Sequence, residues 1–269
     1  MTIKCGYVDT EHGQIHYRFS RASSSGAPTV VYLHKSASSS RMFEATIVGL
    51  ASDYNGYALD MPGFGQSFDP QDVPAIAWYV DIFIQALDRL NIERFHLVGH
   101  HTGGCIAGEM AVLHPKRVLS MTMIGPTLLS AEEREQFRSH YSTPFNKPLA
   151  DGSHLQLTWD YLRRMGVGES LALHQRECLD HARAWHGRTQ AYRTVWDQDF
   201  IAHFLQVQCP MLALCATDDV LWLYFQRVRQ LRPEVSCEVI RGANFEPDLD
   251  APSTVSALRG FLAGCKSRL

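Results

Sequence analysis

The residues best placed to do chemistry in this chain lie in a glycine-rich turn, whose sequence is GHHTGG at 99–104. The apolar run 95–98 precedes the turn, and a helix-like stretch over 105–114 follows it. A tight turn between a strand and a helix is the setting in which a Gly-x-Ser-x-Gly motif exposes a nucleophilic serine. The central residue here is His101, whose imidazole gains and loses a proton near neutral pH. The turn therefore offers proton transfer in place of a hydroxyl nucleophile.

The hydrophobic pattern on both sides of the turn alternates strands with helices. Short apolar or alternating runs predict a hairpin over 7–19 and strands at 29–33, 57–59, 95–98, 118–124, 211–215 and 235–240. Helices are predicted at 75–90, 104–114, 221–231 and 251–263, and the serines at 38–40 could cap a further helix that starts near Arg41. Strand alternating with helix implies a mostly parallel sheet with helices on both faces.

Composition excludes several classes of protein. A chain of 269 residues with 45% hydrophobic and 20% charged residues is typical of one large globular domain, and its net charge of -3 gives no basic field for nucleic acid. No apolar run reaches the roughly 20 residues of a membrane span. The 7 cysteines show no C-x-x-C pair and the 13 histidines no His-Glu-x-x-His spacing. We expect a cytoplasmic protein without metal or cofactor, and with no nucleic-acid or membrane partner.

The segment 127–206 breaks the alternation and contains no strand-like run. A capping box, Ser130 with Glu133, opens a polar helix at its start. We predict a helical cap insertion over 127–206 that lies above the C-terminal edge of the sheet, while 1–126 and 207–269 form the core domain.

The aromatic residues of this segment are expected mainly to pack between its helices. One or two that face a cleft would suit an apolar ligand, and we choose Trp159 and Trp185 as candidates. The histidines of the segment, His181 among them, are expected on its surface.

Three motifs, in order along the chain, resemble those of the α/β-hydrolase superfamily. The sequence DMPGFGQS at 60–67 resembles the turn after the fourth strand of that family, and 99–104 resembles its nucleophile elbow. The third is the run CPMLAL at 209–214 followed by Asp218 and Asp219, which is similar to the strand that delivers the catalytic acid. The resemblance covers nearly the whole chain. It implies an α/β-hydrolase fold, with a mostly parallel central sheet flanked by helices and a helical cap insertion.

The resemblance also implies catalytic positions, two of which depart from the family pattern. His101 stands where the family carries its serine, and Asn244 stands where it carries the base histidine. Asp219 takes the place of the acid, with Asp218 as the runner-up. An amide cannot accept a proton near neutral pH, so serine-type covalent catalysis is not expected. Glu246 is expected in solvent, or as an alternative acid if its loop turns inward.

By position, the backbone N–H groups of Ser36 and Thr102 would form the oxyanion hole. Lys35 replaces a glycine that is usual there, and we expect its side chain at the surface; the alternative is that its ammonium assists a developing negative charge. His34 is expected to brace this loop, and His100 to pack beside the elbow. The candidate pocket residues are His34, Lys35, His100, Trp159 and Trp185.

The two substitutions complement each other in size. Histidine reaches further than serine, and asparagine withdraws part of a ring from the facing loop. We therefore expect the imidazole of His101 to meet Asp219, either directly or through Asn244 as a hydrogen-bonding bridge. A carboxylate partner fixes the tautomer of the ring and raises its basicity.

These features predict an atypical, cofactor-independent enzyme that acts on a small, largely apolar carbonyl or ester-like substrate. His101 would serve as general base, to activate water or to drive a lyase, isomerase or cyclase step, without a serine acyl-enzyme. Direct attack by the imidazole is a third route. The alternative is an inactive pseudo-hydrolase that binds a small-molecule ligand under its cap. A homodimer is left open.

Overall fold

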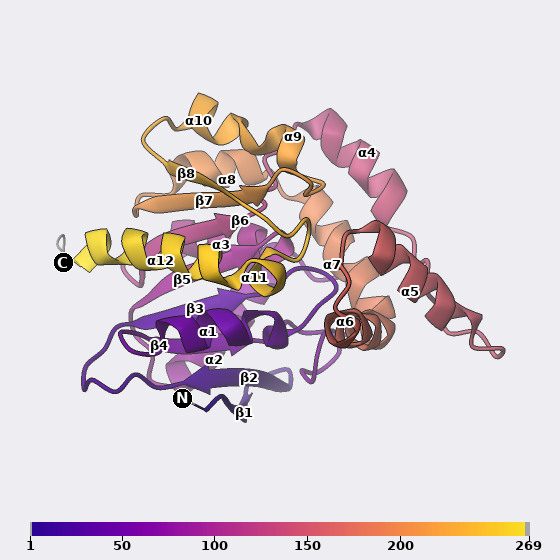
Figure 1. Ribbon diagram of the computed structural model, residues 1–269, viewed down its shortest axis with the longest axis horizontal. Coiled ribbons are helices and arrows are strands. Elements are labelled where there is room, and N and C mark those ends of the chain that lie inside the picture. The colour runs from indigo at the N-terminus through magenta and orange to yellow at the C-terminus, as the bar shows by residue number, and fades with distance from the viewer. Residues whose placement is uncertain (1, 267–269) are drawn as a thin grey trace.

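The structure is a computed structural model that describes residues 2–266. Its centre is an eight-stranded sheet in the order β1-β2-β4-β3-β5-β6-β7-β8 (Figure 1). β2 pairs antiparallel with both β1 and β4, and the remaining neighbours run parallel. The strands span Lys4–Asp9 (β1), Gln14–Ser20 (β2), Thr29–Leu33 (β3), Asn55–Leu59 (β4), Phe95–His100 (β5), Val118–Ile124 (β6), Met211–Ala216 (β7) and Ser236–Ile240 (β8).

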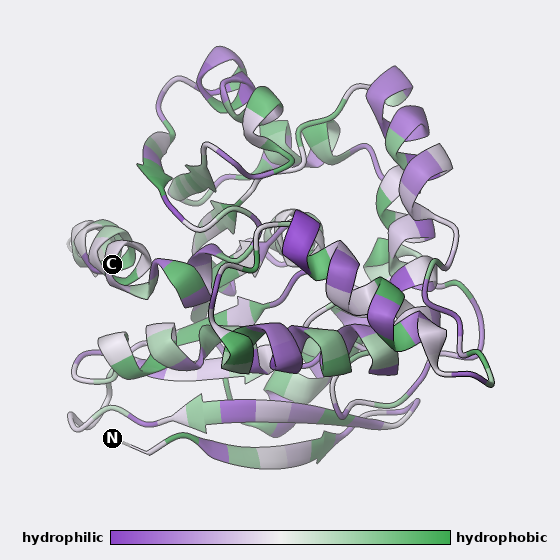
Figure 2. Ribbon diagram, turned by 45° about the vertical axis from the view of Figure 1, so that its right-hand side comes forward, coloured by the Kyte–Doolittle hydropathy of each residue, from purple (hydrophilic) through white to green (hydrophobic). Residues whose placement is uncertain are grey.

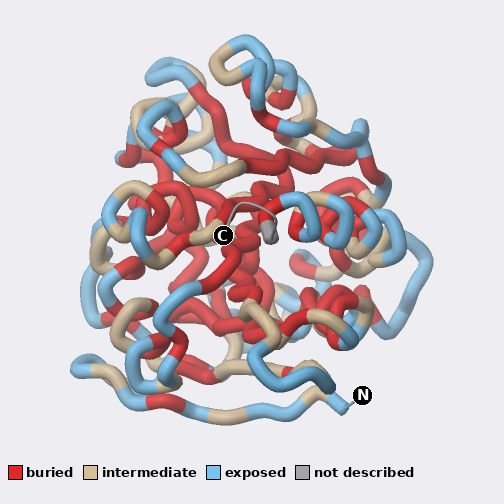
Figure 3. The backbone as a smooth tube through the Cα atoms, turned by 90° about the vertical axis from the view of Figure 1, so that its left-hand side faces the viewer, coloured by how far each residue is buried: buried red, intermediate tan, exposed pale blue. Residues whose placement is uncertain are grey.

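Helices cover both faces of this sheet, as the sequence predicts. The helices outside the segment between β6 and β7 are Glu44–Leu50 (α1), Ile76–Arg89 (α2), Thr102–Leu113 (α3), Trp222–Phe225 (α9), Arg227–Leu231 (α10), Glu246–Leu249 (α11) and Ala251–Lys266 (α12), with a 3-10 turn at Ser40–Phe43 before α1. α1 and α12 lie on one face and α2 and α3 on the other (Figure 1). The helices alternate hydrophobic and hydrophilic residues around their axes (Figure 2), and the central strands are the most buried part of the chain (Figure 3).

Between β6 and β7 the chain forms helices and loops but no strand. The helices span Ala131–Tyr141 (α4), Ser153–Arg164 (α5), Leu171–Arg183 (α6), Trp185–Asp197 (α7) and Phe200–Gln206 (α8). The capping box is present, because Ser130 accepts from the backbone of Glu133 and the Glu133 side chain accepts in return. α4 to α7 gather beyond the C-terminal ends of the parallel strands (Figure 1). α8 instead returns to the sheet and packs against α3.

The differences from the expected elements are local. The predicted helix over 221–231 is two short helices, α9 and α10, and the helix expected near Arg41 begins as a 3-10 turn at Ser40. Within residues 2–266, none of the helices has both the length and the apolar character needed to cross a bilayer.

The turn at 60–67 is held by a buried carboxylate. Asp60 accepts from the backbone N–H of Ser40 at 2.6 Å and of Gln66 at 2.9 Å, and its Oδ2 lies 2.8 Å from Nδ1 of His16. Burial alone would raise the pKa of Asp60, but the hydrogen bond with His16, the nearby His34 and the two backbone donors lower it to about 2. This motif therefore fixes the loops around the site and does not itself reach the cavity described below.

Helix α6 is joined to the loop after β3 by two hydrogen bonds. Ser38 donates to Glu177 at 2.9 Å, and Ser39 donates to Asp180 at 2.7 Å. Burial raises the pKa of Asp180 to about 6, and the carboxylate of Glu177 adds to the rise. Ionised Asp180 is therefore a cost to the folded protein that the hydrogen bond from Ser39 only partly offsets.

We predict that Asp180→Asn gains stability relative to the wild type as the pH rises. The folded-state pKa of about 6 lies above the reference 3.8, so the folded protein binds more protons between these values and its stability falls over that window. An amide does not titrate. The difference in unfolding free energy should shift in favour of Asp180→Asn by about 1–2 kcal/mol between pH 4.5 and 7.5, measured by urea denaturation.

The exposed Asp72 provides the matched control, since Asp72→Asn also removes one carboxyl. Its difference from the wild type should change with pH by no more than about 0.5 kcal/mol. A difference for Asp180→Asn that is equally flat from pH 4.5 to 7.5 would contradict the prediction.

Candidate functional site

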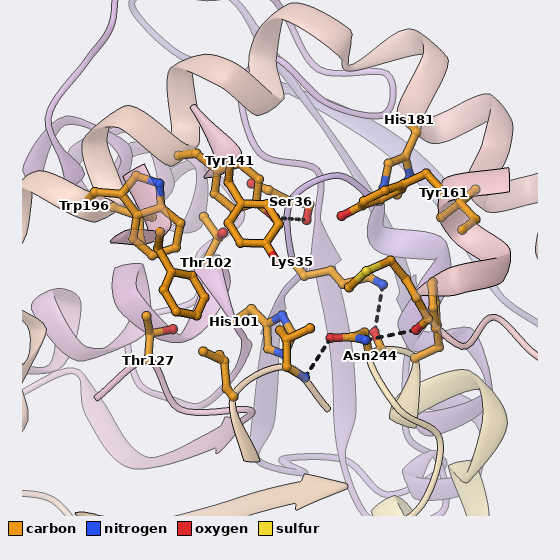
Figure 4. Close-up of a pocket in the computed structure, with 18 residues that line it drawn as sticks. Lys35, Ser36, His101, Thr102, Thr127, Tyr141, Tyr161, His181, Trp196 and Asn244 are labelled. Atoms are coloured by element: carbon orange, nitrogen blue, oxygen red, sulfur yellow. Dashed lines mark hydrogen bonds between the residues drawn. The ribbon is translucent and has the colours of Figure 1, made fainter. Parts of the chain in front are cut away.

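The glycine-rich turn places His101 alone between the end of β5 and the start of α3. Its φ of 46° and ψ of -109° are a conformation that non-glycine residues seldom adopt. The backbone holds it there: the N–H of His101 donates to the carbonyl of Ile124 at 3.0 Å, and its own carbonyl accepts from Cys105 at 3.1 Å. The side chain is consequently presented at the tip of the turn, where it lines a cavity (Figure 4).

The imidazole of His101 contacts Asp219 directly. Its Nε2 lies 2.7 Å from Oδ2 of Asp219, whose Oδ1 accepts from the backbone N–H of Leu221 at 2.6 Å. Burial acts to raise the pKa of Asp219, but the proximity of His101 and its hydrogen bond lower the pKa overall. An ionised carboxylate can only accept, so Nε2 carries the hydrogen of this bond, and in a neutral ring Nδ1 is then the nitrogen with the lone pair. Nε2 of His101 and Oδ2 of Asp219 are thus close enough to share a proton.

Gly125 makes room for this contact. It follows β6 with φ of 58°, and a Cβ built on it would lie 2.3 Å from both Cδ2 and Nε2 of His101. The same Cβ would lie 3.2 Å from Oδ2 of Asp219. The Cδ2–Nε2 edge of the ring therefore faces Gly125, and Nδ1 lies on the side of the ring away from Gly125. Gly125 was not among the residues predicted for the site, although a glycine directly after a predicted strand was the available signal.

Asn244 lines the same cavity but does not bridge His101 and Asp219. Its Oδ1 accepts from the backbone N–H of Val220 at 3.3 Å, and its Nδ2 donates to the carbonyl of Met165 at 2.9 Å. The amide therefore links its own loop to the loops that follow β7 and α5. Of the two expected arrangements, the structure has the direct one.

The expectation that Glu246 lies in solvent is wrong. Its side chain is fully buried behind Asp219, with Oε1 accepting from the backbone of Ala216 at 3.3 Å and Oε2 lying 3.1 Å from Nε2 of His100. Burial, together with the charge of Asp219, raises the pKa of Glu246 well above its ordinary value. Burial and the neighbouring His101 lower the pKa of His100 far below its ordinary value. These shifts favour the neutral forms of Glu246 and His100, and the lowered pKa of Asp219 favours its ionised form.

Lys35 is buried, which corrects its expected place at the surface. Its Nζ donates to the backbone carbonyl of Asn244 at 2.7 Å, lies 3.4 Å from the centre of the Phe245 ring and lies 3.7 Å from Oε2 of Glu177. Burial lowers the pKa of Lys35, and the nearby carboxylates, Glu177 above all, oppose that shift. The side chain lines the cavity beside His101 (Figure 4).

The cavity has a volume of about 50 Å³ and is lined largely by aromatic side chains from the helices that follow β6. Those helices contribute Phe137 and Tyr141 from α4, Tyr161 from α5, His181 from α6, and Tyr192 and Trp196 from α7. His181 is therefore buried and not on the surface as expected, and burial lowers its pKa to about 3. Aromatic walls of this kind favour a flat, apolar ligand.

Four of the five expected pocket residues lie outside the lining. His34 holds its own loop, because its Nε2 accepts from the backbone of Met61 at 2.9 Å. His100 points toward Glu246 on the buried side of the turn. Trp159 stacks on a histidine of α6 with 3.6 Å between ring centroids, and Trp185 packs beside the histidine that follows it. Only Lys35 of this group lines the cavity. The two tryptophans lie on helices, and the rotation of a helix about its axis decides which of its aromatic residues faces inward.

Ser36 and Thr102 both line the cavity. Thr102 is the first residue of α3, where the backbone N–H groups have no partner within the helix. Ser36 is held by α7, since the hydroxyl of Tyr192 donates to the carbonyl of Ser36 at 3.0 Å. The placement suits the predicted oxyanion hole, and the role stays a prediction.

A metal ion is a second arrangement that the residue types allow. Ligand atoms of His100, His101 and Asp219 lie within 4.8 Å of one another. The 2.7 Å hydrogen bond between two of them favours a shared proton at this place.

We predict that Gly125→Ala displaces the His101 ring. A Cβ at this position meets the ring at 2.3 Å, and a positive φ adds its own cost. Gly152→Ala is the matched control, since Gly152 also has a positive φ, 75°, but has nothing within 4 Å of an added Cβ.

The control should lose about 1–2 kcal/mol of stability from its backbone conformation, and Gly125→Ala about 1–3 kcal/mol more. Proton NMR should show the downfield resonance of the hydrogen-bonded His101 Nε2–H in the wild type and in Gly152→Ala, and its loss in Gly125→Ala. An unchanged resonance in Gly125→Ala would contradict the packing.

Comparisons with known proteins agree with this fold. The sequence model of the alpha/beta hydrolase fold matches residues 28–244. The chain spans about a third of the length of the first curated relatives it matches, such as an acetyltransferase component of the acetoin cleaving system of Cupriavidus necator, 34% identical over 112 residues (42% of this chain, 30% of the relative). A putative carbamate hydrolase, RutD, of Yersinia enterocolitica is 26% identical over 228 residues, which cover 82% of this chain and 81% of the relative.

Among solved structures, a putative lipase of Acinetobacter baumannii superimposes with a TM-score of 0.83 at 13% identity, covering 99% of this chain and 93% of that one. An identity this low shows the fold alone. Since the family model covers well over half of the sequence, this chain belongs to the α/β-hydrolase fold family.

Proposed function

We propose that this chain is an enzyme in which His101 acts as a general base on a small, largely apolar carbonyl or ester-like substrate. The observation that carries the proposal is the geometry of one ring: its Nε2 is held by Asp219 at 2.7 Å, its Nδ1 lies on the side away from Gly125, and the residue lines the cavity. A base needs a free lone pair, a fixed tautomer and a partner for the charge that it gains. The hydrogen bond to Asp219 supplies the last two.

The two departures from the family pattern, His101 and Asn244, would then have one explanation: the base stands at a different position. His101 takes the elbow position of the serine nucleophile, and Asn244 takes the position of the base in the last loop. The base has thereby moved from the loop to the elbow, and the carboxylate that holds it is still Asp219. No hydroxyl nucleophile of the protein is needed. The base either removes a proton from a water molecule that attacks the substrate carbonyl, or removes a proton from an acidic group of the substrate itself.

Proton transfer would proceed from the substrate or from water to Nδ1 of His101. The imidazolium that forms lies against the Asp219 carboxylate, and the backbone N–H groups of Ser36 and Thr102 would bind the oxygen on which negative charge develops. General-base catalysis of this kind typically contributes roughly 10²–10⁴-fold. RutD, which is named a putative carbamate hydrolase, gives one example of a relative with a small carbonyl compound as its substrate.

We further propose that the helical segment 127–206 serves as a cap over a core formed by 1–126 and 207–269. Support comes from the cavity, whose aromatic wall is supplied by α4, α5 and α7. A substrate bound over His101 would be enclosed between this wall and the sheet. The competing function is ligand binding without turnover, and it is tested together with the base.

We predict that His101→Ala loses about 10²–10⁴-fold in catalysed proton transfer. Two probes cover the two reaction types: hydrolysis of 4-nitrophenyl acetate, and deuterium exchange at the central carbon of acetylacetone followed by NMR. Asp219→Asn should lose activity in the same direction because the tautomer is no longer fixed. The exposed His186 gives the control, and His186→Ala should keep the wild-type rates.

Two results would contradict a base at position 101. One is an equal rate in the wild type and His101→Ala with either probe. The other is the absence of any catalysed reaction in the wild type, which would favour the ligand-binding alternative.

A second prediction concerns the coupled positions. His101→Ser combined with Asn244→His should recreate a serine, a histidine and Asp219, and intact-mass spectrometry should show stoichiometric labelling by a fluorophosphonate. The wild type and each single variant should stay unlabelled, because each lacks either the hydroxyl or the base. Labelling of the wild type, or equal labelling of one single variant, would show that the two positions do not act together.

A further inference from the structure

The Lys35 ammonium retains hydrogen-bonding capacity inside the cavity. An ammonium has three N–H donors. One is used by the backbone carbonyl of Asn244 at 2.7 Å, and the ring of Phe245 covers another side at 3.4 Å. Glu177 balances the charge but lies 3.7 Å away, beyond hydrogen-bond distance. A donor is therefore left for a bound molecule.

The described residues that line the cavity carry a cation and no carboxylate. Lys35 is the only lysine or arginine among them, and no aspartate or glutamate belongs to the lining. Two acids contact lining residues without joining the lining themselves: Asp219 contacts His101, Glu177 lies 3.7 Å from Lys35, and both side chains are fully buried. A molecule in the cavity would thus contact the ammonium of Lys35 directly, but no carboxylate of the lining.

A second cation lies behind the aromatic wall. Arg188 of α7 is 2% exposed, and its guanidinium lies 4.7 Å from the ring of Tyr192 and 5.7 Å from that of Tyr161. It donates to the backbone carbonyl of Tyr141 at 3.3 Å. Within residues 2–266, no carboxylate lies within 4 Å of it. A buried charge without a counter-ion is costly, so an anion in the adjacent cavity would be stabilised.

The two ends of the cavity differ in chemistry: one is aromatic and the other carries a charged and a polar side chain. Trp196 lies at one end of the cavity, and Lys35 with Asn244 lies toward the other (Figure 4). The ring of Tyr192 stacks on that of Trp196, with 5.5 Å between centroids and 13° between planes. His101 lies between the two ends (Figure 4). A volume of about 50 Å³ holds roughly four water-sized groups, so only a small molecule fits, and one that carries a ring needs the side chains of the wall to move apart.

We infer that this cavity takes a small organic carboxylate whose flat, unsaturated or single-ring part packs at the Trp196 end and whose anionic group binds Lys35. The inference rests on the proposed function, since it names the substrate class of the same cavity. A carboxylate held at Lys35 would place the rest of the molecule beside Nδ1 of His101. Lys35 is then a specificity-determining residue and not a surface lysine.

Isothermal titration calorimetry with three matched pairs tests the inference: crotonate, benzoate and phenylacetate, each against its primary amide. The wild type should bind at least one acid at least tenfold more tightly than its amide. Lys35→Met keeps the length of the side chain without its charge, and should reduce that preference at least tenfold. The control Lys116→Met removes an exposed lysine far from the cavity and should leave the preference unchanged.

His101→Ala separates this inference from the proposed function, because it should keep the preference for acids while losing proton transfer. If His101→Ala retained full activity, the base would be refuted and the anion site would stand. Circular dichroism checks that Lys35→Met is folded. If it is not folded, Lys35→Arg, which keeps the charge, should retain the preference.

Three outcomes would overturn the inference. In the first, none of the three acids binds to the wild type. In the second, each amide binds as tightly as its acid. In the third, folded Lys35→Met keeps the wild-type preference.

Discussion

The site depends on the hydrogen bond between His101 and Asp219. It joins the turn after β5 to the loop after β7, two strands apart in the sheet, across the end of β6. The residue at that end is Gly125, and any side chain there would occupy the path of the bond. The strained backbone of His101, the bare backbone of Gly125 and the buried Asp219 are therefore parts of one constraint, since each is needed for a 2.7 Å contact.

The charge on Asp219 depends in turn on a neighbour that stays neutral. Two carboxyl groups share the space behind the elbow, and buried carboxylates at such short range do not both ionise. The backbone N–H of Leu221 and the imidazole favour the charge on Asp219, while Glu246 faces a neutral His100. The pKa of Glu246 is accordingly raised and that of Asp219 lowered, which favours the proton on Glu246. A single negative charge then faces a single imidazole, which is the balance that a base requires when it gains a proton.

The sequence predicted what depends on local pattern and missed what depends on distant partners. Alternating strands and helices, the elbow and the place of Asp219 follow from short segments whose geometry is fixed by their neighbours. The burial of Lys35 could not be predicted, because it needs Glu177 from α6 and the carbonyl of Asn244 from the last loop. The inward turn of Glu246 has the same cause.

The prediction that Trp159 and Trp185 face the cavity was wrong for a related reason. Trp159 and Trp196 both lie on helices over the site, and helical spacing alone does not say which of them faces the sheet.

The three departures from the family pattern meet at one place. Lys35 donates to the carbonyl of Asn244, and both residues line the cavity with His101. A histidine at position 244 would project a ring into this cavity from the last loop, beside the stem of Lys35. Asparagine is shorter, and its amide is occupied by Val220 and Met165, so the space above His101 stays open for a ligand. The three residues are thus in contact with one cavity, and under the proposed function a base and a cation would replace a nucleophile and its base. Such a site suits proton transfer on an anionic substrate better than acyl transfer through the enzyme.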